Sequence, residues 1–138
     1  MTNLGGIINY SLIGWLSVCI LGILIAPNIL ISLNKRFIKT KNKNYFKIIK
    51  FLRKLHKPLG LALLFMGLIH GYMALGTLKL HTGTLFYLSI IITAALGGSF
   101  YKTKNKLFFK WHKRMAFFTV VLFFLHYIAP SAIYYLIN

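Results

Sequence analysis

Four of the five histidines in this 138-residue chain occur in two pairs with the same spacing. The interval from His56 to His70 is identical to the interval from His112 to His126. On an α-helix, this interval makes almost four turns, so both histidines of a pair share one face of the helix. Because they would lie about 21 Å apart along that face, they are too distant to bind the same ion. Each histidine therefore needs a partner on another helix.

The residue types that the chain lacks restrict the chemistry of such pairs. The chain contains no Asp or Glu but 17 Lys and Arg residues. It therefore has no carboxylate side chain for acid–base catalysis or for a hard-cation site. Two neutral imidazoles that face each other inside a bundle suit the axial ligation of a haem iron better than zinc, which takes four ligands. The lone Cys19 has no disulfide partner within the chain and is interpreted as an apolar core residue.

The elements that position these histidines are predicted to lie in a membrane. The chain is 58% hydrophobic with a mean hydropathy of +0.72, which is outside the range of water-soluble domains. Its apolar stretches are long enough to cross a core of about 30 Å, and they lack the alternation of barrel strands. We expect an all-α membrane protein: one domain over residues 1–138, a bundle of four transmembrane helices at Ile7–Leu33, Leu55–Leu78, Thr84–Tyr101 and Phe108–Ile137.

Proline positions refine these helices. Pro27 and Pro130 are expected to kink the first and fourth helices, whereas Pro58 is expected in the first turn of the second helix. The N-terminal span is interpreted as a true membrane helix, because a signal peptide would begin with a basic segment.

The basic residues predict how the helices are oriented. Residues 35–57 carry ten Lys or Arg and residues 102–114 carry six, while the turn near Lys79 carries one. By the positive-inside rule, both basic segments face the cytoplasm and both termini lie outside the cytoplasmic membrane, which we expect to be bacterial. The basic segments are interpreted as topology signals that attract anionic lipid, and no nucleic-acid binding is expected.

This topology makes the second and fourth helices parallel, so their histidines are matched in depth. His56 is predicted to pair with His112 near the cytoplasm, and His70 with His126 near the outside. Two haem b groups between these helices would then have the four histidines as iron ligands. Each ring is expected to donate its other N–H to the carbonyl four residues back. The fifth histidine, His81, has no partner at its depth and is expected to be a solvated loop residue.

Further residues on the second and fourth helices would accommodate a flat cofactor. Gly60 and Gly67 share the histidine face of the second helix and leave room for a ring, although close helix packing is an alternative role. Arg53, Lys113 and Arg114 lie at the cytoplasmic ends of the ligand helices, where they would neutralise haem propionates.

The two histidine segments also repeat each other. Leu55-His56-Lys57-Pro58 corresponds to Trp111-His112-Lys113-Arg114, and each segment follows a basic run and precedes a second histidine. With these His pairs on two helices separated by one helix, the chain resembles the ferric reductase-like transmembrane domain of ferric reductases and NADPH oxidases. It more distantly resembles the four-helix di-haem core of cytochrome b. The resemblance implies two stacked b-type haems and electron transfer across the membrane.

The chain departs from this family in ways that bear on its partners. Ferric reductases usually have six membrane helices and a cytoplasmic FAD/NAD(P)H domain, and this chain contains no G-x-G-x-x-G segment. A separate electron donor is therefore expected, either a cytoplasmic flavin reductase or a quinol. The expected acceptor is an extracytoplasmic flavoprotein, ferric iron or oxygen. The chain would be an oxidoreductase subunit without catalytic side chains of its own.

Three other functions stay open at this point. The chain fits the quinone-linked cytochrome b anchor of a larger dehydrogenase, although quinol-oxidising cytochromes b commonly use acidic residues that are absent here. Its cationic composition also fits a small pore former, and its histidines fit a haem or metal transporter. The matched His intervals favour stable haem ligation, because a pore former has no use for them and a transporter would bind haem exchangeably.

Overall fold

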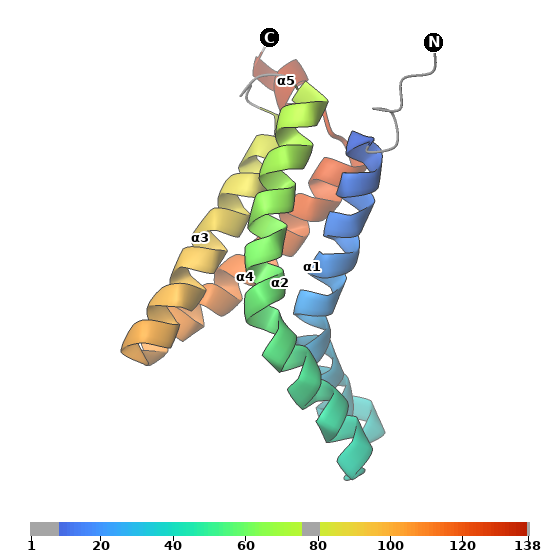
Figure 1. Cartoon of the computed structure of the whole chain (residues 1–138), viewed down its shortest axis with the longest axis vertical. Coiled ribbons are helices and arrows are strands. Elements are labelled where there is room, and N and C mark those ends of the chain that lie inside the picture. Colours follow the sequence, from blue (N-terminus) through green and yellow to red (C-terminus); the bar gives the residue numbers. More distant parts are fainter. Residues whose placement is uncertain (1–8, 76–80, 138) are drawn as a thin grey trace. The chain divides into compact units, whose positions relative to one another are not determined.

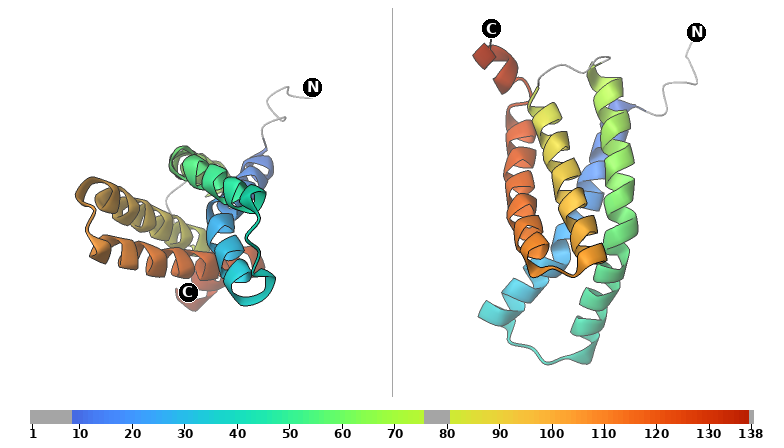
Figure 2. Two further views of the ribbon diagram at one scale, coloured as in Figure 1. Left: turned by 90° about the horizontal axis from the view of Figure 1, so that it is seen from below. Right: turned by 90° about the vertical axis from the view of Figure 1, so that its left-hand side faces the viewer.

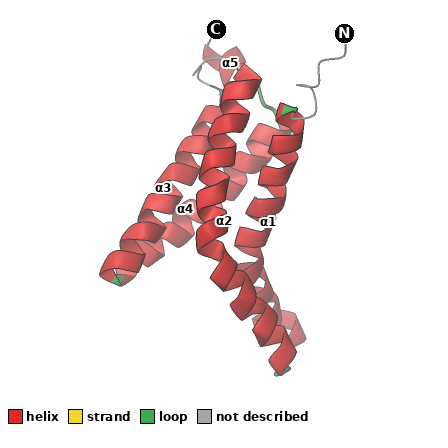
Figure 3. Ribbon diagram, in the orientation of Figure 1, coloured by secondary structure: helices red, strands yellow, loops and turns green. Residues whose placement is uncertain are grey.

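The computed structural model describes residues 9–75 and 81–137, which form helices without any strand (Figure 3). This confirms the predicted all-α class. The chain divides into two compact units at Gly67, which lies inside the second α-helix, and each unit is described by itself. The helices, coloured along the chain in Figure 1, are α1 (Tyr10–Leu33), the π-helical turn η2 (Asn34–Ile38), α2 (Lys43–Leu75), α3 (Thr82–Thr103), α4 (Lys106–Ile128) and α5 (Ala132–Ile137).

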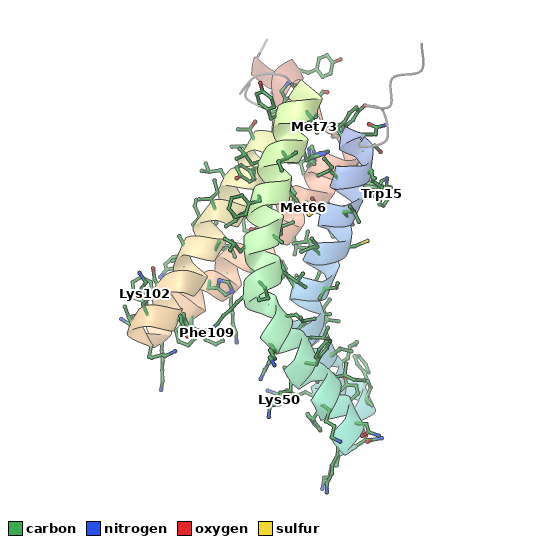
Figure 4. The ribbon with its side chains drawn as sticks, in the orientation of Figure 1. Trp15, Lys50, Met66, Met73, Lys102 and Phe109 are labelled. Carbon is green, nitrogen blue, oxygen red and sulfur yellow. The ribbon has the colours of Figure 1, made fainter. Side chains whose placement is uncertain are left out.

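Three of these helical segments are long and apolar enough to cross a membrane: Tyr10–Ile38, Lys43–Ala74 and Thr82–Thr103. Large apolar side chains on their surfaces are exposed, including Trp15 at 57% and Phe65 at 60%, as expected of helices surrounded by lipid. Figure 4 shows Trp15 on the outside of α1. Helix α4 is not among the three, and its first three turns carry four cations: Lys106, Lys110, Lys113 and Arg114.

The first unit contains α1, η2 and most of α2, joined by a hydrogen-bonded connection. The Asn34 side chain accepts a hydrogen bond from the Thr40 amide at 2.8 Å and donates to the Thr40 carbonyl at 3.3 Å. Lys39 ends η2 in the left-handed conformation at φ 49°. Beyond the connection, the Tyr45 hydroxyl of α2 donates to the Leu30 carbonyl of α1 at 2.7 Å. These bonds fix the turn between the two helices.

Two of the helix boundaries differ from those expected. Helix α2 begins at Lys43 rather than Leu55, so Pro58 lies in its interior and the prediction of a first-turn proline is wrong. The lysine-rich segment favours a helix, and it simply continues the membrane helix. Pro130 follows the end of α4 at Ile128 and separates it from α5, so the chain breaks there instead of kinking. The predicted ends of the first two spans, Ile7 and Leu78, lie outside the described residues.

The second unit is built around an antiparallel hairpin of α3 and α4, which lie side by side in both views of Figure 2. Lys104 ends α3 with φ 56°, and the Asn105 side chain caps α4 by accepting from the Leu107 amide at 2.9 Å. Phe100 and Phe109 pack near this turn with ring centroids 4.9 Å apart. Phe86 and Phe123 pack towards the other end of the hairpin at 5.8 Å.

The interface between α3 and α4 contains buried polar residues. Thr82, Ser89 and Thr119 are only 1%, 3% and 4% exposed. Each makes hydrogen bonds: Ser89 to the Phe86 carbonyl at 2.6 Å, and Thr119 to the Thr93 hydroxyl at 3.1 Å. Such a polar seam between two apolar helices places hydrogen-bonding groups beside the α4 histidines.

Candidate functional site

His112 contacts α3 through one defined ring nitrogen. Its Nδ1 lies 2.8 Å from the backbone carbonyl oxygen of Thr93. A carbonyl can only accept a hydrogen bond, so Nδ1 must carry the proton. In the neutral ring, Nε2 then holds the lone pair with which an imidazole binds a metal. The expected acceptor four residues back on α4 is wrong, because the acceptor lies on the neighbouring helix.

His126 is held in the same tautomer by a different group. Its Nδ1 lies 3.3 Å from the Thr82 hydroxyl oxygen, and that hydroxyl also forms a short hydrogen bond with the Pro130 carbonyl. The single hydroxyl hydrogen goes to the carbonyl, so the oxygen must accept from His126 Nδ1–H. Nε2 again holds the lone pair. Phe86 stacks on the ring with centroids 6.0 Å apart and planes at 21°, which further fixes its orientation.

Two glycines of α3 provide the space for these rings. A Cβ atom at Gly97 would lie 3.0 Å from a ring nitrogen of His112, and one at Gly83 would lie 3.0 Å from a ring carbon of His126. A side chain at either position would therefore press on a ring. By contrast, a Cβ at Gly98 would meet nothing within 4 Å.

These α3 residues were not identified from the sequence as parts of the site. A signal for the glycines exists, because the interval from Gly83 to Gly97 is the same as that between the histidines of a pair. In an antiparallel hairpin, equal intervals on both helices bring each glycine opposite one histidine. The contribution of Thr93 had no signal, since its backbone carbonyl is common to every residue type.

Both histidines of the predicted outer pair, His70 and His126, belong to the second unit. Their pairing as iron ligands stays a prediction. His81 immediately precedes α3 and is partly exposed. Its assignment as a solvated loop residue stays a prediction.

The inner pair is divided between the two units. His56 belongs to the first unit and is partly buried on α2, while His112 belongs to the second. Their pairing stays a prediction that rests on sequence spacing and topology.

The remaining predicted site residues are two glycines of α2 and three cations of α2 and α4. Gly60 and Gly67 are partly buried, and a Cβ at Gly60 would have open space around it. Arg53, Lys113 and Arg114 are exposed. The Lys113 ammonium lies 4.6 Å from the centroid of the Phe109 ring, and the Arg114 guanidinium lies 5.1 Å from the Trp111 ring. These cation–π contacts hold both cations at the start of α4. Lys79 lies outside the described residues.

A bis-histidine haem would require fewer ligands from the chain than a bare metal ion. Among the residues that the structure describes, no three His, Cys, Asp or Glu side chains are close enough to share a metal ion. A haem iron takes its four equatorial ligands from the porphyrin and requires only axial ligands from the chain. The tautomer of both α4 histidines, with Nδ1–H donated to α3, is the one that metal-bound histidines generally have.

Comparisons with known proteins add no relationship to these observations. No protein-family model matches the sequence, and neither a curated protein nor a solved structure is significantly similar to it.

Proposed function

We propose that the chain is a small membrane cytochrome that carries electrons from the cytoplasm to the outside. His56 with His112 would hold an inner haem b, and His70 with His126 an outer one. The observation that supports this most strongly is that Nδ1 of both α4 histidines lies within hydrogen-bonding distance of an oxygen atom on α3, which leaves Nε2 of each ring for a metal. When bound, haem supplies reversible one-electron transfer, for which the chain has no side chain of its own.

The residues around the histidines would prepare them for this role. Thr93 and Thr82 fix the rotation of each ring and raise the basicity of Nε2 by accepting the Nδ1–H hydrogen bond. Gly97 and Gly83 leave the space that the rings occupy. Arg53, Lys113 and Arg114 would supply positive charge for propionates at the cytoplasmic end. All of these contributions are available without a single carboxylate side chain.

A separate protein or a quinol is proposed to supply the electrons to the inner haem. A cytoplasmic flavin reductase or a quinol would donate, and an extracytoplasmic flavoprotein, ferric iron or oxygen would accept. In a bacterial cytoplasmic membrane with both termini outside, outward transfer is favoured by about 2.3 kcal/mol per 100 mV of inside-negative potential. The direction from the cytoplasm to the outside therefore follows from the predicted topology.

The first experiment is an optical spectrum of the purified protein before and after dithionite, with haem quantified per chain. We expect the bands of low-spin b-type haem and two haems per chain. His70→Ala should leave one haem. His81→Ala provides a matched control, because it removes a histidine of the same unit that is not a predicted ligand. A haem-free protein, or equal haem loss in both variants, would contradict the assignment.

A second experiment tests the direction of transfer. The protein is reconstituted in liposomes of known orientation with reductant inside, and reduction of an impermeant ferric complex outside is followed. Transfer at a rate well above that of protein-free liposomes is expected. If both haems are intact but the external ferric complex is not reduced, the proposal of electron transfer across the membrane is wrong. The quinone-linked membrane anchor then becomes the better proposal.

A further inference from the structure

The first half of α2 carries a regular row of lysines on one side. These lysines follow one another at intervals of four, three, four and three residues, which keeps them within about 40° of a common direction on the helix. All are exposed: Lys43, Lys47, Lys50, Lys54 and Lys57. We call these five residues the lysine row. Figure 4 shows Lys50 projecting from the lower part of α2.

The opposite side of this segment is occupied within the first unit. Ile49 is 4% exposed, and Tyr45 is tied to α1 through its bond to the Leu30 carbonyl. The packed face of α2 therefore orients the lysine row away from α1. Phe46 and Phe51 flank the row with exposures of 47% and 60%. The helix therefore presents a regular row of positive charges bordered by aromatic rings, which would attract a partner of opposite charge.

The chain has no acidic side chain to neutralise the lysine row. Because the sequence contains no Asp or Glu, an ion pair with a carboxylate side chain of the same chain is impossible. The same composition excludes a second copy of the chain as the partner, because two such rows would repel each other. The complementary anions must come from a different molecule.

The direction of the row argues against lipid headgroups as its main partner. The uncharged remainder of α2, Pro58–Leu75, is about 27 Å long and nearly fills a membrane core of about 30 Å. The lysine row continues the same helix for about 21 Å beyond it. Since screening limits the attraction of a lipid surface to about 8 Å at physiological salt, a row that projects away from the membrane would have Lys54 and Lys57 near the headgroups but Lys43 and Lys47 beyond their reach.

We propose that the lysine row docks a cytoplasmic protein that presents a row of carboxylates. That this protein is also the electron donor rests on the proposed function, because His56 lies at the membrane end of the row and is a predicted ligand of the inner haem. Docking itself requires no haem. Its salt dependence and its partner class follow from the charges alone.

The test uses the full-length protein in nanodiscs of neutral phosphatidylcholine. The probe is a fluorescent helical peptide with glutamates at intervals of four, three, four and three residues, compared with a scrambled peptide of the same composition. We expect the matched peptide to bind at least tenfold more tightly than the scrambled one. Replacing Lys43, Lys47 and Lys50 with Gln should weaken binding about tenfold and reduce its salt dependence. The control replaces Lys102, Lys104 and Lys110 and should change binding less than twofold.

Three outcomes would overturn the proposal. Equal binding of both peptides would show that the row attracts negative charge without register. A second adverse outcome combines two measurements in nanodiscs enriched in anionic phosphatidylglycerol. If the matched peptide no longer binds, and the emission of a dye attached at Asn44→Cys moves to shorter wavelength, the row lies on lipid. Tighter binding of duplex DNA than of the matched peptide would make nucleic acid the partner. Because binding is measured on both haem-free and haem-loaded protein, failure here is distinguishable from failure of the electron-transfer proposal.

Discussion

Thr82→Val removes one hydroxyl and leaves a side chain of nearly the same size at a position that is 1% exposed. That hydroxyl accepts from His126 Nδ1 at 3.3 Å and donates to the Pro130 carbonyl. The variant therefore leaves two groups without this partner, and each buried polar group left unsatisfied costs about 1–3 kcal/mol. We expect the free energy of unfolding to fall by about 2 kcal/mol or more. Haem affinity at the outer site should fall by about 10- to 100-fold, as when other partners of metal-bound histidines are removed.

The assay is a haem titration of the apo-protein in detergent, followed by absorbance, together with chemical unfolding of the same samples. Thr82→Ser restores the hydroxyl and should recover most of both losses. Ser89→Ala is the matched control, because Ser89 is also buried on α3 but donates within its own helix to the Phe86 carbonyl. Unchanged outer-site affinity in Thr82→Val, or an equal loss in Ser89→Ala, would refute the argument that Thr82 orients the ring.

The other predictions concern the second unit. Gly97→Ala should impair binding of the inner haem and Gly83→Ala binding of the outer one, because each added Cβ would lie about 3.0 Å from an imidazole ring. The control Gly98→Ala adds a Cβ that meets nothing within 4 Å and should retain both haems. The number of haems per chain is measured for each variant. His126→Ala should remove one haem and leave the other about 21 Å away intact, and loss of both from a folded protein would contradict the pairing by depth. Lys104→Gly should raise stability by about 0.5–1 kcal/mol, since φ is 56° there, and a lower midpoint of thermal unfolding would contradict that.

Hydropathy predicted where apolar helices occur but not how far they extend. It locates the residues that face lipid, and the lysines before Leu55 ended the expected second span. Lysine nevertheless favours helices, so α2 begins at Lys43 and Pro58 falls in its interior. At the other end, Pro130 was expected only to bend a continuous helix. The structure ends α4 at Ile128, so the Pro130 carbonyl is available to the Thr82 hydroxyl.

The matched spacing of the histidines is visible in the sequence, whereas the groups that hold the two α4 rings are not, and the role of the histidines as ligands stays a prediction. Identical intervals between histidines are visible in a sequence, because a helix converts spacing into direction. A hydrogen bond to the Thr93 backbone carbonyl depends on how two helices pack, and it cannot be predicted from residue type because every residue has such a carbonyl.

Helix α3 therefore does more than connect α2 to α4 along the chain. It holds both α4 rings by the same device, a glycine that admits the ring and an oxygen that takes its Nδ1–H. Immobilising a side chain on binding costs about 0.5–1.5 kcal/mol, and a ring already held in one rotamer and tautomer avoids part of that cost. Affinity for a bis-histidine cofactor would then depend on α3 residues that never touch it. A chain with no carboxylate side chain to orient its histidines requires such acceptors from backbone carbonyls and hydroxyls, and the α3–α4 hairpin provides both.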